Sequence, residues 1–499
     1  MPATRLPFSA KSYDFVEYAS CHNFIGGELR PAASGETLAV ENPRHAKVMG
    51  KVAMSGAADV AAAVASATAA FAKWRTVPVK ERAQVFHRLK SLMERDLAEL
   101  AWLVSHENGK TYAEAEADVL KGIECVEFGA SLPSLVGGAK LEVSRGVTCE
   151  VSYEPLGVVG GVTPFNFPVM VPLWMLPQAV VGGNAFVLKP SEQVPYGAMK
   201  IALLLREAGL PDGVVNVVNG GRPAVEAVVD HKDVVAFAFV GSTTVAKALY
   251  ARAAAHGKRV LCLGSAKNHL IIAPDADVEM TAQNVVASSF GCAGQRCMAS
   301  SLVVAVGDVD RIIEAIAAHA RRIQLGAGMG SIINEASVLR ISRAIDQAEA
   351  GGAKVLLDGR GAKVAGAPGY WVGPTVLDHL RPEMPAACEE IFGPVLSIVR
   401  VPTLEAAITL QNSSRYGNGA AVYTSSGAVA RHVAAKLTAG MVGINVGVPV
   451  PREPFSFGGW KDSKFGHGDI TGLDGFRFWT APRKLTSKWE LQPDANWMS

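Results

Sequence analysis

Apolar residues in the N-terminal part of this 499-residue chain recur at every third or fourth position. That spacing is typical of amphipathic helices, which bury one stripe of their side chains. It predicts a single long helix over residues 81–107, ended by Asn108-Gly109, and further helices over residues 57–74 and 113–130. Residues 1–24 lack this pattern, and we expect them to form an N-terminal extension.

From Leu156 onward, short and nearly continuous apolar runs alternate with helical patterns. Strands that are apolar on both faces and alternate with helices indicate a parallel sheet covered on both sides. A first block of strands is expected at residues 156–163, 184–189, 214–218, 234–240 and 258–263. A second block is expected at residues 270–273, 301–306, 354–357, 395–401 and 440–445. The predicted fold class is therefore α/β, with two blocks whose boundary lies near Gly264.

Two further segments show a weak alternation of apolar and polar residues. Residues 139–154 alternate as a β-hairpin does, and residues 476–489 alternate as an edge strand does. A ribbon of this kind has free backbone donors and acceptors and can pair with another chain. These segments are therefore candidates for contacts between copies of the protein.

Composition excludes several classes of protein. The formal net charge is only +2, which gives no electrostatic footprint for nucleic acid or for an anionic membrane. No stretch is long and apolar enough to span a bilayer, and the N-terminal residues lack a signal-peptide core. The seven cysteines are scattered, with no spacing that suits zinc. We expect a reducing, cytoplasmic compartment (the mitochondrial matrix if the source is eukaryotic) and no metal, nucleic-acid or membrane partner.

Residues 290–299 hold the first candidate for chemistry, because Cys292, Arg296 and Cys297 lie there among small residues. A cation beside a thiol favours the thiolate, which is the nucleophilic form. Free cysteines are also among the most buried residues, so a purely structural role for both thiols stays open. Two prolines and two aromatic residues surround Asn166, whose amide donor suits a developing oxyanion. A turn-stabilising role for this asparagine is the alternative.

Three more motifs lie at predicted strand ends and suit a dinucleotide. Glu192, with Lys189, follows the second strand, where a carboxylate can accept both ribose hydroxyls and would repel a 2′-phosphate. Ser242 opens a helix whose N-terminus suits a pyrophosphate, although the G-x-G-x-x-G fingerprint is absent. Glu389 and Glu390 precede a turn, where either is placed to hold a second ribose. The alternatives are an exposed ion pair for the first motif and ordinary surface acids for the last.

In their order and spacing, these motifs resemble the aldehyde dehydrogenase superfamily, and the resemblance runs from about residue 23 to residue 489. It implies a Rossmann-like NAD-binding domain, an α/β catalytic domain and a small oligomerisation β-ribbon. The implied boundaries are 1–138 and 158–263 for the NAD-binding domain, 264–467 for the catalytic domain, and 139–157 and 468–499 for the ribbon and tail. It also implies a homodimer or homotetramer.

The resemblance assigns roles to individual residues. Cys297, not Cys292, matches the nucleophile, and Asn166 matches the oxyanion donor together with the Cys297 backbone N–H. Lys189 and Glu192 match the adenosine-ribose contacts, and Glu390 matches the nicotinamide-ribose contact. The full set of matching cofactor positions is Thr163, Phe165, Lys189, Glu192, Ser242, Glu390 and Phe392.

Finer details resemble the CoA-acylating branch of this superfamily, the methylmalonate-semialdehyde dehydrogenases. The stretches concerned are Pro164–Pro172, Ala266–His269, Gly294–Ala299 and Thr486–Trp489. The branch holds the substrate carboxylate with an arginine that matches Arg296 and a second arginine at the position of Lys121. The resemblance therefore implies that Arg296, with Lys121 in support, binds the substrate carboxylate, although lysine keeps the charge and loses the bidentate fork. Hydrolytic members carry a glutamate base upstream of the nucleophile, whereas residues 260–268 here contain no carboxylate.

The expected reaction is NAD-dependent oxidation of a small anionic aldehyde, malonate or methylmalonate semialdehyde, through a thioester on Cys297. Without a base to activate water, CoA is the expected acyl acceptor, and decarboxylation gives acetyl-CoA or propionyl-CoA. One alternative is a non-acylating dehydrogenase of another anionic aldehyde that releases the free acid. A second is a catalytically silent NAD-binding or structural member, which the joint presence of Cys297, Asn166 and Glu390 disfavours.

Overall fold

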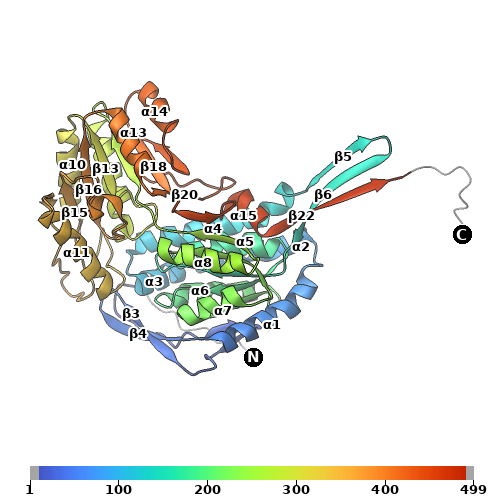
Figure 1. The fold of residues 1–499 in the computed structure, drawn as a ribbon. Coiled ribbons are helices and arrows are strands. Elements are labelled where there is room, and N and C mark those ends of the chain that lie inside the picture. The colour runs from blue at the N-terminus through green and yellow to red at the C-terminus, as the bar shows by residue number, and fades with distance from the viewer. Residues whose placement is uncertain (1–10, 490–499) are drawn as a thin grey trace, which may run out of the picture.

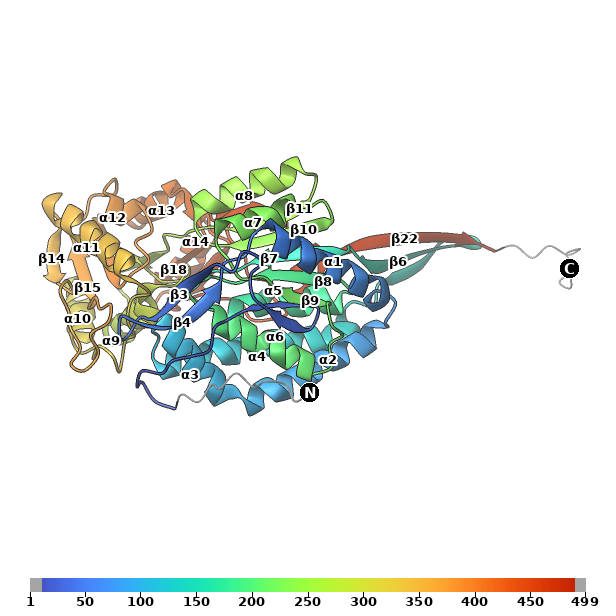
Figure 2. The same cartoon turned by 90° about the horizontal axis from the view of Figure 1, so that it is seen from below.

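The computed structural model describes residues 11–489 of the chain. Two sheets form the centres of two blocks, and a long β-ribbon projects away from them (Figure 1; Figure 2). The expected extension, residues 1–24, and the expected tail, residues 468–499, reach outside the described residues at 1–10 and 490–499. Within the described range, no helix is long and apolar enough to cross a membrane.

The first sheet has eight strands in the order β2-β1-β9-β8-β7-β10-β11-β21. Its strands are β1 (Asn23–Ile25), β2 (Glu28–Arg30), β7 (Val158–Val162), β8 (Ala185–Lys189), β9 (Val215–Val217), β10 (Val234–Val240), β11 (Arg259–Leu263) and β21 (Lys464–Gly466). The strands from β9 to β11 in this order are parallel, and β1, β2 and β21 run antiparallel to their neighbours. The apolar runs predicted before residue 264 are therefore confirmed as neighbouring strands of one sheet.

Helices cover both faces of this sheet because its strands are apolar on both faces. Phe237 and Phe239 of β10 pack with α1, α7 and α8, while Ala236 and Ala238 belong to the core on the side of α5 and α6. The long helices α2, α3 and α4 pack behind α5 and α6. These helices are α1 (Ala57–Trp74), α2 (Val79–Arg95), α3 (Leu97–Asn108), α4 (Tyr112–Leu135), α5 (Met170–Val181), α6 (Pro195–Glu207), α7 (Arg222–Asp230) and α8 (Thr243–Ala255).

The single helix predicted over residues 81–107 is two helices, α2 and α3, so that prediction is wrong. Asp96 separates them with φ −100° and ψ 16°, outside the helical region. Its carboxylate pairs with Arg95 at 2.7 Å and with Lys200 at 2.9 Å. The apolar spacing continues across Asp96, and periodicity alone therefore does not show the break.

The second sheet has seven strands in the order β14-β15-β16-β13-β12-β18-β19. They are β12 (His269–Ile272), β13 (Leu302–Val306), β14 (Lys354–Leu357), β15 (Thr375–Asp378), β16 (Val395–Val401), β18 (Gly419–Tyr423) and β19 (Met441–Ile444). All pairs are parallel except β14 with β15. The strands predicted for the second block are confirmed, but sequence reasoning missed β15 and β18.

Helices of the second block are α9 (Val278–Phe290), α10 (Asp310–Arg321), α11 (Glu335–Ala350), α12 (Pro385–Cys388), α13 (Leu404–Ser413) and α14 (Gly427–Ala434). Two small sheets pair β3 (Thr37–Asn42) with β4 (Lys47–Ala53) and β17 (Tyr416–Gly417) with β20 (Trp460–Lys461).

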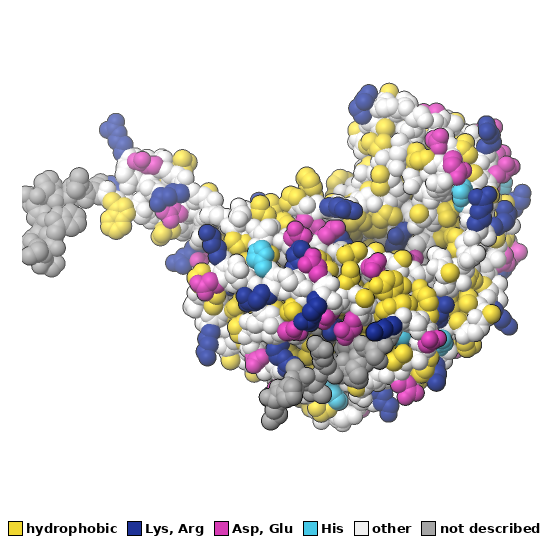
Figure 3. Space-filling view, turned by 180° about the vertical axis from the view of Figure 1, so that it is seen from behind, with side chains coloured by type: hydrophobic (Ala, Val, Ile, Leu, Met, Phe, Trp, Pro, Cys, Tyr) yellow, Lys and Arg dark blue, Asp and Glu magenta, His cyan; other side chains and the backbone are white. Residues whose placement is uncertain are grey.

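Acidic and basic side chains are interspersed over the face shown in Figure 3. That mixture accords with a net charge of only +2.

The projecting ribbon is a three-stranded antiparallel sheet with β6 in the middle. Its strands are β5 (Ala139–Ser144), β6 (Val147–Pro155) and β22 (Thr480–Lys488), and helix α15 (Gly472–Phe478) precedes the last of them. The hairpin predicted over residues 139–154 is confirmed. The edge strand predicted over residues 476–489 is wrong at its start, because Phe476 and Phe478 belong to α15 and are buried. Leu141 on the ribbon remains 68% exposed.

Polar contacts from the α3–α4 region hold the loop between β7 and α5, which carries Asn166. Asn108 Nδ2 donates to the carbonyl of Phe165 at 2.8 Å. The ammonium of Lys110 lies 3.6 Å from the ring centre of Phe167. Both chain neighbours of Asn166 are therefore fixed by one nearby segment.

Lys110 also pairs with Asp118 at 3.1 Å, and the two side chains are 2% and 0% exposed. Removing one partner of such a buried pair leaves an uncompensated charge and costs about 3–5 kcal/mol. Replacing Asp118 by Ala is therefore expected to lower the apparent Tm by several degrees in thermal unfolding followed by circular dichroism. The matched control, Glu94→Ala, breaks the more exposed Lys90–Glu94 pair, for which about 0–1 kcal/mol is typical. Equal effects of the two substitutions would contradict this prediction.

Candidate active site

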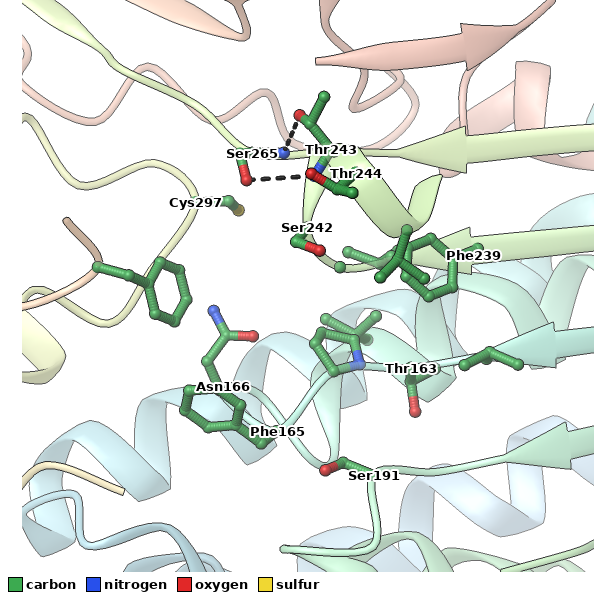
Figure 4. Close-up of a pocket in the computed structure, with 18 of the residues that line it drawn as sticks. Thr163, Phe165, Asn166, Ser191, Phe239, Ser242, Thr243, Thr244, Ser265 and Cys297 are labelled. Carbon is green, nitrogen blue, oxygen red and sulfur yellow. Dashed lines mark hydrogen bonds between the residues drawn. The ribbon is translucent and has the colours of Figure 1, made fainter. Parts of the chain in front are cut away.

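A cavity of about 890 Å³ lies at the carboxyl ends of β7, β8 and β10 (Figure 4). Parallel sheets bind ligands at this edge because the diverging strand ends leave a crevice there. The predicted cofactor positions that line the cavity are Thr163, Phe165, Lys189, Glu192, Ser242, Glu390 and Phe392. The structure thus brings together every residue to which the sequence analysis gave a cofactor role.

Polar groups on the first-sheet side of this cavity are available to a ligand. Lys189 ends β8 and is buried, and its ammonium lies 2.9 Å from Glu192 Oε2. Ser242 is the N-cap residue of α8, but its side chain makes no capping hydrogen bond. The hydroxyl of Thr163 is buried without a hydrogen-bond partner among the described residues. A carboxylate for ribose hydroxyls and a helix N-terminus for a pyrophosphate are the groups that a dinucleotide requires.

Thr243 and Ser265 tie the start of α8 to the segment after β11. The Ser265 N–H donates to Thr243 Oγ1 at 2.9 Å, and the Thr243 N–H donates to Ser265 Oγ at 3.3 Å (Figure 4). Thr243 Oγ1 donates in turn to the carbonyl of Asp462 at 2.9 Å. Sequence reasoning found the motif around Ser242 but missed this contact, because it depends on β10 and β11 being neighbours.

Glu390 reaches the cavity from the second block and is half-buried. Its carboxylate accepts a hydrogen bond from the Ala266 N–H at 3.1 Å. Burial raises the pKa of Glu390, while that hydrogen bond and the ammonium of Lys267 oppose the rise. Burial lowers the pKa of Lys267 to about 8. Phe392, at a φ of 54°, packs edge-on against Phe165 with ring centres 5.7 Å apart.

The segment before Cys297 turns sharply. Cys292, Ala293 and Gly294 have φ values of 54°, 51° and 67°, all in the left-handed region. At Gly294 a Cβ would lie 2.1 Å from the carbonyl oxygen of Gly393, so only glycine permits this approach to the loop that carries Glu390. Backbone strain of this kind concentrates at functional sites.

Cys297 lines the cavity, whereas Cys292 is buried elsewhere. The carbonyl of Cys297 accepts hydrogen bonds from Asn268 Nδ2 at 2.8 Å and from Asn418 Nδ2 at 3.2 Å. In Figure 4 the amide of Asn166 points toward Cys297 across the cavity. The expected nucleophile and oxyanion donor therefore face each other, and two asparagines without a predicted role hold the nucleophile.

The surroundings of Cys297 disfavour the thiolate form of its side chain in the absence of ligands. The pKa of its thiol is raised to about 12, first by burial and second by the carboxylate of Glu390. Its own backbone N–H and the guanidinium of Arg296 act in the opposite direction. Because the thiolate is the attacking form, a ligand that draws the Glu390 carboxylate away would activate the thiol.

A second cavity, of about 460 Å³, also reaches Cys297. Both cavities are lined by Phe167, Trp174 and Cys297, and the charged residues of the second one are Lys121, Arg296, Arg452 and Glu453. Arg296 Nη2 donates to the carbonyls of Ala287 at 2.6 Å and Ser288 at 2.9 Å. Lys121 donates to Glu453 at 2.7 Å. The two predicted substrate-binding cations therefore share this cavity, while sequence reasoning missed Arg452 and Glu453.

The aldehyde dehydrogenase family profile matches residues 30–485. Malonate-semialdehyde dehydrogenase 2 of Geobacillus thermodenitrificans (strain NG80-2) is 45% identical over 481 residues, which cover 95% of this chain and 100% of the relative. The solved methylmalonate-semialdehyde dehydrogenase of Oceanimonas doudoroffii is 40% identical, with a TM-score of 0.93 over 95% of this chain and 99% of that one. A Sinorhizobium meliloti 1021 protein, assigned as a methylmalonate-semialdehyde dehydrogenase and solved with NAD, is 41% identical, with a TM-score of 0.93 over 96% and 99%.

The chain belongs to the aldehyde dehydrogenase family. Its two blocks and projecting ribbon form the aldehyde dehydrogenase fold, as the high TM-scores over nearly the whole chain show. The predicted α/β fold class and the resemblance to the aldehyde dehydrogenase superfamily are therefore both confirmed.

Replacing Glu390 by Gln removes a charge that raises the pKa of Cys297. The thiolate fraction at a given pH should then rise. In the NAD-free protein, we expect the pH profile for alkylation of Cys297 by iodoacetamide to shift by about one unit toward lower pH. Glu389→Gln is the control, because Glu389 lines the same cavity but is bound by Arg415 and Tyr416. An unshifted profile for Glu390→Gln, or the same shift for both variants, would refute the effect.

Proposed function

We propose that this protein oxidises malonate or methylmalonate semialdehyde, with NAD as the hydride acceptor and CoA as the acyl acceptor. The observation that carries the proposal is the position of Cys297 between two cavities. One has the size and polar groups for a dinucleotide, and the smaller one contains the cation Arg296. The relatives named malonate- and methylmalonate-semialdehyde dehydrogenase support the same substrate class.

The residues of the larger cavity fit NAD. Glu192 and Lys189 would hold the adenosine ribose, and the carboxylate would repel the 2′-phosphate of NADP. Ser242, at the start of α8, would hold the pyrophosphate, and Glu390 the nicotinamide ribose. The remaining contacts come from Thr163, Phe165 and Phe392. When bound, NAD accepts the hydride, and the NAD complex of the Sinorhizobium relative supports this choice.

The chain's own residues carry the first half of the reaction. The Cys297 thiolate attacks the aldehyde carbon, which forms a C–S bond and turns the carbonyl oxygen into an oxyanion. The amide of Asn166 and the Cys297 backbone N–H donate to that oxyanion. When the carbonyl re-forms, hydride leaves and a thioester remains on Cys297. Arg296 binds the substrate carboxylate, and Lys121 shapes the charge of the same cavity.

The second half of the reaction follows from the chemistry of the thioester. In a malonyl-type thioester the carboxylate lies β to the carbonyl, so loss of CO2 gives an enolate that the same donors stabilise. A proton from solvent then converts the enolate to the acetyl or propionyl thioester, and attack by the CoA thiolate displaces the Cys297 thiolate. Residues 260–268 contain no carboxylate, so a general base for water is missing from that segment. A thiol ionises more readily and is a better nucleophile. Transfer to CoA then yields acetyl-CoA or propionyl-CoA.

A second candidate function is a non-acylating dehydrogenase that releases the free acid. Glu390 favours it, because this carboxylate acts on the pKa of Cys297 and its own pKa is raised by burial. A carboxylate of that kind is suited to activate water. The requirement for CoA separates the two functions.

We also propose that different segments of the chain form domains with different functions. Residues 1–138 and 158–263 bind NAD, residues 264–467 form the catalytic domain, and residues 139–157 with 468–499 join copies into a homodimer or homotetramer in the cytoplasm. Exposed apolar side chains on the ribbon, Leu141 and Leu485, support the last assignment.

Purified protein with NAD and malonate semialdehyde should form NADH continuously only when CoA is present. We expect the steady rate to fall by more than about tenfold without CoA, because residues 260–268 supply no general base to activate water. Spectrophotometry follows NADH, and mass spectrometry identifies acetyl-CoA or free acid. Turnover to free acid at an unchanged rate without CoA would favour the non-acylating function instead.

Cys297→Ala removes the nucleophile and is expected to lower kcat by about a thousandfold or more. Cys292→Ala removes a buried thiol outside both cavities and should leave most of the activity. NADH formation under saturating substrates measures both variants. Comparable losses of activity in the two variants would show that both substitutions act by disturbing the fold, and would contradict the role of Cys297 as the nucleophile.

A further inference from the structure

Glu453 places a buried carboxylate on the wall of the smaller cavity. Its side chain is only 8% exposed and lies on the loop after β19. Oε2 accepts a hydrogen bond from Lys121 Nζ at 2.7 Å, and Oε1 accepts one from Cys125 Sγ at 3.6 Å. Both oxygens are engaged by α4, so the carboxylate is fixed in position.

Lys121 is a cation whose charge is already compensated. Besides Glu453, its ammonium pairs with Glu124 at 2.9 Å, one turn further along α4. Burial lowers the pKa of Lys121, but the hydrogen bonds to the two carboxylates outweigh it and raise the pKa overall. The lysine therefore stays protonated with two anionic partners.

Arg296 is in the opposite situation within the same cavity. Its guanidinium donates to two backbone carbonyls, which orient it but do not cancel its charge. Its buried Nε has no hydrogen-bond partner, and no carboxylate lies within ion-pair distance of Arg296, among residues 11–489. Arg452, the remaining cation, is 81% exposed and 3.7 Å from Glu124.

We propose that Glu453 is a specificity-determining residue: it neutralises Lys121, so that Arg296 alone binds the substrate carboxylate. The proposal rests on the proposed function and deepens it by naming the substrate class. The cavity then accepts an aldehyde with a single carboxylate placed to reach Arg296. A second anionic group would find no uncompensated buried cation in this cavity, because Lys121 is already paired with Glu453, and its desolvation would be costly.

The same geometry defines the part played by Lys121. A substrate carboxylate could engage Lys121 only by competing with Glu453, which is already in hydrogen-bond contact with it. The lysine instead compensates a carboxylate that would otherwise stand unpaired in the cavity, which is costly. Lys121 and Glu453 should therefore act as a unit, and their substitutions should offset each other.

A double-mutant cycle tests this coupling with two readouts. The first is the ratio of rate constants for alkylation of Cys297 by iodoacetate, an anion, and by iodoacetamide, which is neutral. The second is the ratio of kcat/KM for malonate semialdehyde to that for propanal. Lys121→Met should lower both ratios by about tenfold, and Glu453→Gln should raise them, because each exposes the charge of the other partner. The double variant should lie within about twofold of the wild type.

If Lys121 binds the substrate directly, a different result is expected. The double variant would then show ratios as low as Lys121→Met alone, and that result would overturn the proposal. So would a Glu453→Gln variant with unchanged ratios. Glu124→Gln is the matched control, because Glu124 also pairs with Lys121 but does not line the cavity. Glu124→Gln should leave both ratios within about twofold of the wild-type values.

Two additions keep the outcomes separable. Lys121→Gln replaces Lys121→Met if the latter does not unfold cooperatively, and the same offset by Glu453→Gln is required. Alkylation needs no turnover, so it reports the charge of the cavity even if neither aldehyde is oxidised. Coupled alkylation ratios without semialdehyde oxidation would refute the proposed function and support the role of Glu453. Alkylation ratios that show no coupling between Lys121 and Glu453, together with normal oxidation of the semialdehyde, would refute the role of Glu453 and support the proposed function.

Discussion

The side chain of Asn268 joins the three segments on which the active site depends. It lies in the crossover between the first and second sheets, and its amide donates to the carbonyls of Cys297 at 2.8 Å and Ala299 at 3.0 Å. Its carbonyl oxygen accepts from the Gly419 N–H at 3.0 Å, at the start of β18. A fully satisfied buried amide of this kind is stabilising only in one arrangement of its partners. The nucleophile therefore keeps its place only while the two sheets keep theirs.

The two cavities at Cys297 handle charge in different ways. On the dinucleotide side, burial raises the pKa of the Cys297 thiol and the half-buried carboxylate of Glu390 raises it further. On the aldehyde side, Glu453 and Lys121 cancel each other and Arg296 remains uncompensated. The charges on the first side therefore act on the protonation of the thiol, while those on the second side leave one cation, Arg296, without a carboxylate partner among the described residues.

Much of this arrangement can be predicted from the sequence, and the remainder cannot for physical reasons. The strands of the first sheet are continuous apolar runs, and the cofactor positions follow directly after them, so local pattern is sufficient. The break at Asp96 is hidden because apolar spacing runs through it. β18 is missed because Gly419–Tyr423 begins with Gly and two Ala, which are depleted in strands, and its burial comes from neighbours far along the chain. Glu453 is missed because its partner, Lys121, stands on another element that only the tertiary fold brings near.

The position of β21 has a consequence for the order of synthesis. Residues 464–466 pair with β11 and form the last strand of a sheet whose other strands end by Leu263. While the chain grows from its N-terminus, β11 stays an open edge until the whole second sheet has left the ribosome. Open edges invite pairing with other chains. The nascent protein therefore carries an unfinished first sheet while residues 264–463 are synthesised, and the edge of β11 is exposed to other chains during that interval.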